Sequence, residues 1–104
     1  MPSVVDLIKS SKRLTRNLWV DIRVSKAPEG TRLVVVTPRK SGNAVKRNQF
    51  KRRIKALFRE LGLAKFGYSW IFFAKKDVAS CSFTTLRLLL EEAARKLSEQ
   101  HSSH

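Results

Sequence analysis

The segment KRNQFKRRIKALFR, from Lys46 to Arg59, constrains the fold of this chain more than any other part of the sequence. Its apolar residues, and one just beyond it, recur at i, i+4, i+7, i+8 and i+11, which places them on one side of a helix. These residues are Phe50, Ile54, Leu57, Phe58 and Leu61. Asn43 is a suitable N-cap and Gly62 a suitable C-terminal stop. The pattern therefore predicts a helix with one face buried against a domain.

The other side of this helix carries charge of one sign. Seven of the fourteen residues from Lys46 to Arg59 are Lys or Arg and none is acidic. Opposite the apolar stripe lie Asn48, Lys51, Arg52, Lys55 and Arg59, with Arg47, Gln49 and Arg53 at the margins. Like charges four residues apart destabilise an isolated helix by about 0.2–0.5 kcal/mol per pair. Because clustered cations on one face are typical of nucleic-acid binding, we interpret this face as a polyanion-binding surface rather than a merely solvated one.

Composition supports a single domain with a polyanionic partner. The chain has 104 residues, 42% of them hydrophobic, which is enough for one compact core but too little for two. The net charge of +14 exceeds what solubility requires. No apolar stretch approaches the length of a membrane span, and Asp6 interrupts the N-terminal segment. Charge alone would suit a nucleic acid, an anionic membrane or an acidic protein. Together with the cationic helix face, it leads us to expect one RNA-binding domain over residues 1–104, with a disordered tail from about 99 to 104, in a cytoplasmic protein without a membrane partner.

No group of residues suggests catalysis or metal binding by the protein itself. Cys81 is the only cysteine, which excludes an intrachain disulfide, and we interpret it as a small loop residue. His101 and His104 lie in the expected tail. The eight acids are scattered, and no nucleophile or phosphate-binding motif is present. We therefore expect neither catalytic residues nor metal ligands, and no cofactor bound by the protein alone.

Periodicity elsewhere predicts an α+β domain. Residues 4–11 form a weak helix candidate, and residues 18–25 alternate as a strand with one polar face. The apolar run at 32–37 suggests a strand covered on both faces, joined to the first as an antiparallel hairpin. A third strand at 69–75 should pair in parallel with the second across the basic helix. Ser82 can cap a last helix. The expected order is α-β-β-α-β-α, a small mixed sheet with helices packed on it.

The segment GNAVKRNQFKRRIKALFRE, residues 42–60, resembles the signature of the bacterial ribonuclease P protein subunit. Members of that family tend to read S-K-K-x-G-N-A-V-x-R-N-R-x-K-R-x-x-R at this place. The matching residues are Gly42, Asn43, Ala44, Val45, Arg47, Asn48, Lys51 and Arg52, and Lys55 keeps the charge of an arginine. The order of elements also agrees over nearly the whole chain. Gln49 in place of the second Arg, and Pro38 in place of Ser, depart from the pattern.

The resemblance implies the protein subunit of an endoribonuclease, which assists a catalytic RNA in removing the 5′ leader from precursor tRNA. Hydrolysis would then be carried out by the RNA with bound Mg²⁺. The implied partners are the catalytic RNA subunit and precursor tRNA, with no obligate protein partner. The implied fold is ribosomal-protein-S5-domain-2-like, with a left-handed βαβ crossover where general handedness rules favour the right-handed form.

Two sets of candidate site residues follow. The RNA-binding set is Lys40, Arg47, Asn48, Lys51, Arg52, Arg53, Lys55 and Arg59. The polar face of the first strand offers Trp19 and Arg23, able to stack on and neutralise a single strand, and by resemblance this face lines the cleft for the leader. Asp21 on that face is unexpected, because a carboxylate repels phosphate.

Several alternatives stay open at this point. Trp19 could instead pack as ordinary core, whereas core positions are favoured for Trp70, Phe72 and Phe73. A second basic cluster, made of Lys9, Lys12, Arg13 and Arg16, could extend the RNA surface or simply be solvated. A ribosomal or RNA-chaperone-type protein would share the charge and size. A DNA-binding module would offer a few base-reading residues at one end of the helix, instead of cations along a whole face.

Overall fold

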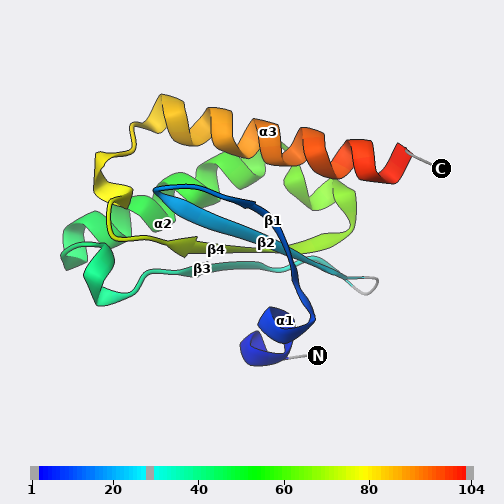
Figure 1. Ribbon diagram of the computed structural model, residues 1–104, viewed down its shortest axis with the longest axis horizontal. Coiled ribbons are helices and arrows are strands. Elements are labelled where there is room, and N and C mark those ends of the chain that lie inside the picture. The colour runs from blue at the N-terminus through cyan, green and yellow to red at the C-terminus, as the bar shows by residue number, and fades with distance from the viewer. Residues whose placement is uncertain (1–2, 28–29, 103–104) are drawn as a thin grey trace.

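A computed structural model describes residues 3–27 and 30–102 of the chain (Figure 1). It is an α+β domain with three helices and a four-stranded sheet in this part of the chain. The helices and strands are α1 (Val4–Ser10), β1 (Lys12–Arg16), β2 (Val20–Lys26), β3 (Leu33–Val36), α2 (Ala44–Glu60), β4 (Tyr68–Ala74) and α3 (Phe83–Ser102). Three short 3-10 turns connect them: η1 (Arg39–Ser41), η2 (Leu63–Phe66) and η3 (Val78–Ser80).

The sheet has the strand order β1-β2-β4-β3, and this order corrects one prediction. The expected antiparallel hairpin between the second and third strands is wrong, because β4 lies between them. β4 pairs antiparallel with all of β2, from Val20 opposite Ala74 to Lys26 opposite Tyr68. The expected parallel pairing across the basic helix is confirmed, with Leu33 opposite Trp70 and Val36 opposite Phe73. The handedness of this crossover stays a prediction.

Strand β1 was missed by the sequence pattern. Residues 12–16, KRLTR, contain one apolar residue, Leu14, which is too few to establish an alternation. The strand pairs antiparallel with β2 and has an irregularity between Arg13 and Thr15 that lets Leu14 reach the core. Leu18, expected as a strand residue, is instead exposed in the turn between the two strands.

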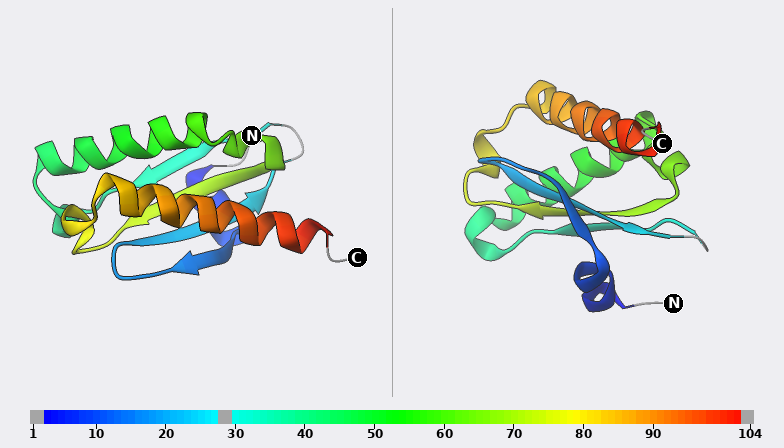
Figure 2. Two further views of the ribbon diagram at one scale, coloured as in Figure 1. Left: turned by 90° about the horizontal axis from the view of Figure 1, so that it is seen from above. Right: turned by 45° about the vertical axis from the view of Figure 1, so that its right-hand side comes forward.

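The main core lies between the sheet and the two long helices. Figure 2 shows α2 and α3 over one face of the sheet and α1 on the opposite face. Val20, Ile22 and Val24 of β2 point to the helical side and are fully buried, as are Trp70 and Phe72 of β4. These alternate positions pack against the apolar stripe of α2, so the sheet presents that helix with its cationic side outward. The expected core positions of Trp70 and Phe72 are confirmed.

Phe73 does not belong to this core. It is only half-buried and lies opposite Asp21 in the register, on the sheet face that carries α1. Strand β3 also differs from the expectation of full burial, since all four of its residues are half-buried. The reason is its position at the edge of the sheet, where only one neighbouring strand is present among the described residues.

Helix α2 begins and ends as its sequence predicts. The Asn43 side chain accepts a hydrogen bond from the Lys46 backbone N–H at 2.9 Å. Gly62 adopts the left-handed conformation, with φ of 61°, just after the helix ends. We expect Asn43→Ala to lower the free energy of unfolding by about 1 kcal/mol, because one N–H of the first turn loses its acceptor. Urea unfolding of the free protein measures this, and Asn43→Asp, which keeps the acceptor, should retain most of the stability. Equal losses in both variants would contradict a capping role.

Helix α3 also begins at its predicted cap, since the Ser82 hydroxyl accepts from the Thr85 backbone N–H at 3.1 Å. It continues to Ser102, so residues 99–102, where a disordered tail was expected, are helical. Arg95 donates to Glu99 at 2.9 Å, one turn apart, which favours helix in this region. The expected tail residues 103–104 lie outside the described residues. In the described part of the chain, none of the helices is long and apolar enough to cross a bilayer.

Candidate nucleic-acid interface

The outward face of α2 is a cationic surface that a single element provides. Arg52, Lys55 and Arg59 are exposed on it, together with Asn48, and Lys51 is half-buried. Within residues 3–27 and 30–102, none of these cations forms a salt bridge. Their mutual repulsion is therefore relieved only by solvent and salt, and a polyanion on this face would replace both.

The one acid of α2 points away from that face. Glu60 pairs with Arg87 of α3, with 2.8 Å between its Oε2 and the Arg87 Nη1. This bond raises the pKa of the Arg87 guanidinium above its ordinary value and joins the ends of two packed helices. The carboxylate is thereby held on the α3 side, so it does not neutralise Arg59 or Lys55.

Two further candidates lie near the start of α2. Lys40 is exposed on η1, which leads into the helix through Gly42. Gly42 has φ of 145°, and a Cβ there would lie 3.2 Å from the Cβ of Lys46, so a side chain would be both strained and crowded. Arg47 is half-buried, and its Nε is buried without a hydrogen-bond partner. The loop and the first turn thus bring cations together at one end of the helix.

Arg53 is separated from the other candidates. It lies on the flank of α2 that faces α3, with its guanidinium carbon 5.8 Å from the centre of the Phe83 ring. It lines a small pocket with Lys46 and Gln49 instead of continuing the outward face. Sequence reasoning placed Arg53 at the margin of the stripe, and the structure places it across the apolar side from Lys55.

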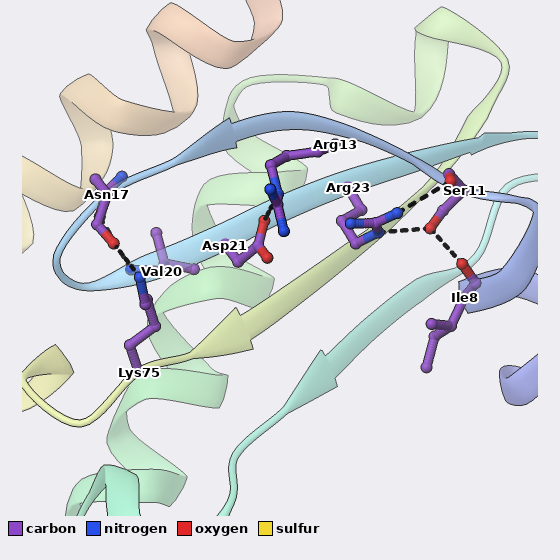
Figure 3. Close-up of polar contacts among 8 residues, drawn as sticks. All are labelled: Ile8, Ser11, Arg13, Asn17, Val20, Asp21, Arg23 and Lys75. Carbon is purple, nitrogen blue, oxygen red and sulfur yellow. Dashed lines mark hydrogen bonds and ion pairs between the residues drawn. The ribbon is translucent and has the colours of Figure 1, made fainter.

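The sheet face that carries α1 holds a second polar group, centred on Arg23 (Figure 3). The Arg23 Nε donates to the Ser11 hydroxyl at 2.8 Å, and its Nη2 donates to the Ser11 carbonyl at 3.2 Å. The same hydroxyl donates to the Ile8 carbonyl at 2.6 Å. Arg23 therefore connects β2 to the end of α1, which fixes its position on this face.

Asp21, the unexpected acid, has a cationic neighbour on β1. Its Oδ1 lies 3.4 Å from the Nε of Arg13, as Figure 3 shows, and its side chain is 18% exposed. Arg13 lies opposite Arg23 in the register and Arg16 lies opposite Asp21, so both belong to the same sheet face. The strand missed in the sequence thus supplies two cations beside Arg23, and the Arg13 charge offsets the repulsion that Asp21 would exert on a phosphate.

The structure does not bring Trp19 and Arg23 together. Trp19 lies before β2 begins, packs against the main core and donates from its indole N–H to the Ser80 hydroxyl at 3.1 Å. The reason is the turn at Asn17, whose Oδ1 accepts from the backbone N–H groups of Trp19 and Val20. Lys75 donates to the Asn17 carbonyl at 2.8 Å and holds this turn against β4 (Figure 3). In the sequence, Asn17 was the signal for this turn, because an Asn side chain often accepts from the backbone N–H two residues further on.

The aromatic residue on the α1 face is Phe73, which sequence reasoning had assigned to the core. The alternation along β4 shows that Phe73 and Ile71 share one face, whereas Trp70 and Phe72 share the other. An almost continuous apolar run hides this difference in the sequence. The described residues contain no group of three His, Cys, Asp or Glu side chains that could hold a metal ion.

Comparison with known proteins gives consistent matches. A family model described as Ribonuclease P matches residues 6–98. The ribonuclease P protein component of Mycoplasmopsis synoviae is 26% identical over 96 residues, which cover 92% of this chain and 85% of that protein. The ribonuclease P protein component of Petrotoga mobilis is 32% identical over 75 residues, which cover 71% of this chain and 64% of that protein.

Solved structures show the same fold. The RNase P protein from Thermotoga maritima superposes with a TM-score of 0.71 at 26% identity, covering 86% of this chain and 89% of that chain. The RNase P protein of Staphylococcus aureus superposes with a TM-score of 0.74 at 21% identity and covers 91% of each chain, a likeness that concerns the fold alone.

Proposed function

The chain belongs to the ribonuclease P family, and from this premise we propose that it binds the catalytic RNA of ribonuclease P through α2 and the 5′ leader of precursor tRNA through the α1 face of the sheet. The family match supports the role of a protein component and gives no support to the alternative of a ribosomal or RNA-chaperone-type protein. The observation that carries the proposal is the unpaired cationic face of α2, held outward by a buried apolar stripe.

On α2, Arg52, Lys55 and Arg59 would hold backbone phosphates of the RNA. The planar guanidinium can grip a phosphate through two donors, and the lysine ammonium provides a compact charge. Asn48 both donates and accepts, so it suits a 2′-hydroxyl or a base edge. Such contacts recognise the shape and backbone of a folded RNA more than its sequence.

On the α1 face, Arg16 and Arg23 would neutralise an extended leader, while Arg13 offsets the charge of Asp21. Arg23 uses its Nε–H and one N–H of Nη2 on Ser11, so both N–H groups of Nη1 and the second N–H of Nη2 can donate to a phosphate. Phe73, half-buried on the same face, takes the stacking role that sequence reasoning gave to Trp19. Stacking tolerates any base, which suits a subunit that must accept many leaders.

In this proposal the protein positions its partners and the RNA carries out the hydrolysis. The Mg²⁺ held by the RNA would supply charge stabilisation at the scissile phosphate. The protein contributes by neutralising the phosphates of two nucleic acids that must approach each other. We therefore expect the protein to raise the rate of leader cleavage most where salt and Mg²⁺ are too dilute to screen that repulsion alone.

Reconstitution tests the proposal. We expect the protein, mixed with a bacterial ribonuclease P RNA and precursor tRNA at near-physiological Mg²⁺ and salt, to raise the rate of leader cleavage over that of the RNA alone. The benefit should shrink as Mg²⁺ and salt are raised, because ions then replace the protein charge. A ribosomal RNA fragment of equal length serves as the binding control. Equal affinity for both RNAs without any rise in cleavage would overturn the proposal.

A further inference from the structure

A small pocket lies on the flank of α2 that faces away from its outward cations. It is lined from α2 by Lys46, Gln49, Phe50 and Arg53, and on the other side by Val78, Ala79, Cys81 and Leu86. Its volume of about 80 Å³ is well above the roughly 10–15 Å³ that a single water requires. η3 packs beside α2 and leads into α3 (Figure 1). The residues that line the pocket come from these three elements and from Cys81, which directly follows η3.

The polar groups of this pocket are all able to donate to an anion. Lys46, Gln49 and Arg53 are spaced three and four residues apart, so they form one row along α2. Lys46 offers an ammonium, Gln49 an amide N–H₂ and Arg53 a guanidinium, and no acid is among the residues that line the pocket. Two cations beside one concave surface repel each other until an anion lies between them.

Packing limits the freedom of Arg53, whereas Lys46 is exposed. Arg53 lies over the Phe83 ring, which keeps its guanidinium at the pocket. The stem of Lys46 lies against Gly42. A Cβ at position 42 would lie 3.2 Å from the Cβ of Lys46, so the glycine leaves space for the lysine side chain. The Arg53 charge is also felt inside the pocket. Burial raises the pKa of the Cys81 thiol, and Arg53 acts in the opposite direction.

We propose that this pocket is a second phosphate site, in which Lys46, Gln49 and Arg53 hold one backbone phosphate of the RNA that binds the outward face of α2. The inference rests on the proposed function and extends it. The RNA then contacts α2 on two flanks and touches the junction with α3, rather than lying along a single stripe. Gln49 stands where the family pattern has an arginine. In this site its amide is a neutral donor between the cations Lys46 and Arg53, which supply the positive charge.

Charge removal gives the first test. The variant Lys46→Gln/Arg53→Gln should lower the slope of log K against log salt for ribonuclease P RNA, by about 0.7–0.9 for a single lost phosphate contact. The matched control is Lys65→Gln/Lys96→Gln, which removes the same charge outside the pocket and includes a lysine held over the Phe66 ring. The control should leave the slope unchanged. Gln49→Arg should instead bind the RNA more tightly than the wild type does, because it adds a cation to the pocket.

Cys81 gives a local test, because it lines the pocket and is the only cysteine of the chain. Saturating RNA should slow the reaction of Cys81 with methyl methanethiosulfonate in the wild type, since a bound phosphate blocks the pocket and disfavours the thiolate. In Lys46→Gln/Arg53→Gln, with RNA saturating the outward face, this protection should be lost. Each variant is compared with its own rate without RNA.

The outcomes separate this inference from the function on which it depends. If the protein raises leader cleavage, while RNA leaves the Cys81 rate unchanged and both double variants behave alike, the pocket proposal is overturned and the function stands. If no ribonuclease P RNA binds at all, both fail. Protection of Cys81 together with a lower slope only in the pocket variant supports the second site.

Discussion

Replacing Arg52 and Lys55 with alanine is expected to weaken binding of ribonuclease P RNA by about 25- to 60-fold at 0.1 M salt. The figure follows from counterion release, in which each phosphate contact contributes a slope of about 0.7–0.9 in log K against log salt. Two lost contacts therefore lower the slope by about 1.4–1.8. Both side chains are exposed and free of salt bridges in the described structure, so the loss should appear in binding and not in folding.

The stability of this variant separates binding from unfolding. Alanine favours helix, and the change removes like-charge neighbours such as Lys51/Lys55, so the free energy of unfolding should rise slightly. Affinity is measured by filter binding across a salt series, with Lys65→Ala/Lys96→Ala as the control of equal charge. A parallel fall in both variants would mean that net charge, rather than the outward face of α2, determines the affinity.

Replacing Trp70 with alanine is expected to destabilise the protein by about 3–5 kcal/mol, which is the cost of deleting a large buried side chain and leaving a cavity. Trp70 is fully buried at the centre of the sheet. Its ring stacks on Phe72, with 6.0 Å between ring centres, and lies 6.5 Å from Phe66. Because native domains are stable by only about 5–15 kcal/mol, this variant should be largely unfolded in mild denaturant.

Trp70→Phe is the matched control. The Nε1 of Trp70 is buried without a hydrogen-bond partner, so phenylalanine removes an unsatisfied donor while keeping an aromatic ring in the core. Its loss of stability should be much smaller than that of the alanine variant. Urea unfolding followed by circular dichroism compares the two. Equal losses would show that the indole itself, and not the filled volume, stabilises this position.

The elements with a clear period could be predicted from the sequence, whereas the pairing of the strands could not. The apolar stripe and both ends of α2 are specified by local residues, from Asn43 to Gly62. The hairpin prediction was wrong because a short turn favours pairing of neighbouring strands, while here the later strand β4 supplies a partner for both. The pairing of β4 with both strands depends on burying Trp70 and Phe72 against residues far away in the sequence. A short stretch of sequence does not reveal those contacts.

The cations of α2 could likewise be identified from their spacing, which also places Arg53 in one row with Lys46 and Gln49. What could not be predicted is what that row faces, since Arg53 contacts the ring of Phe83, which lies thirty residues further along the chain. The α1 face was harder still to predict. Its cations Arg13 and Arg16 lie on a strand with one apolar residue, and its aromatic residue Phe73 is hidden within an apolar run.

The central place of β4 has a consequence for the order in which the chain can fold during synthesis. The ribosome makes β1, β2, β3 and α2 before the strand that joins β2 to β3 exists. Until Ala74 has emerged, the nascent chain carries the whole cationic sequence of α2 without the sheet that presents it. Folding must therefore wait for long-range pairing, which is slower than local helix formation. A nascent chain stopped before Tyr68 should associate with RNA through its charge alone, without the shape recognition of the finished protein.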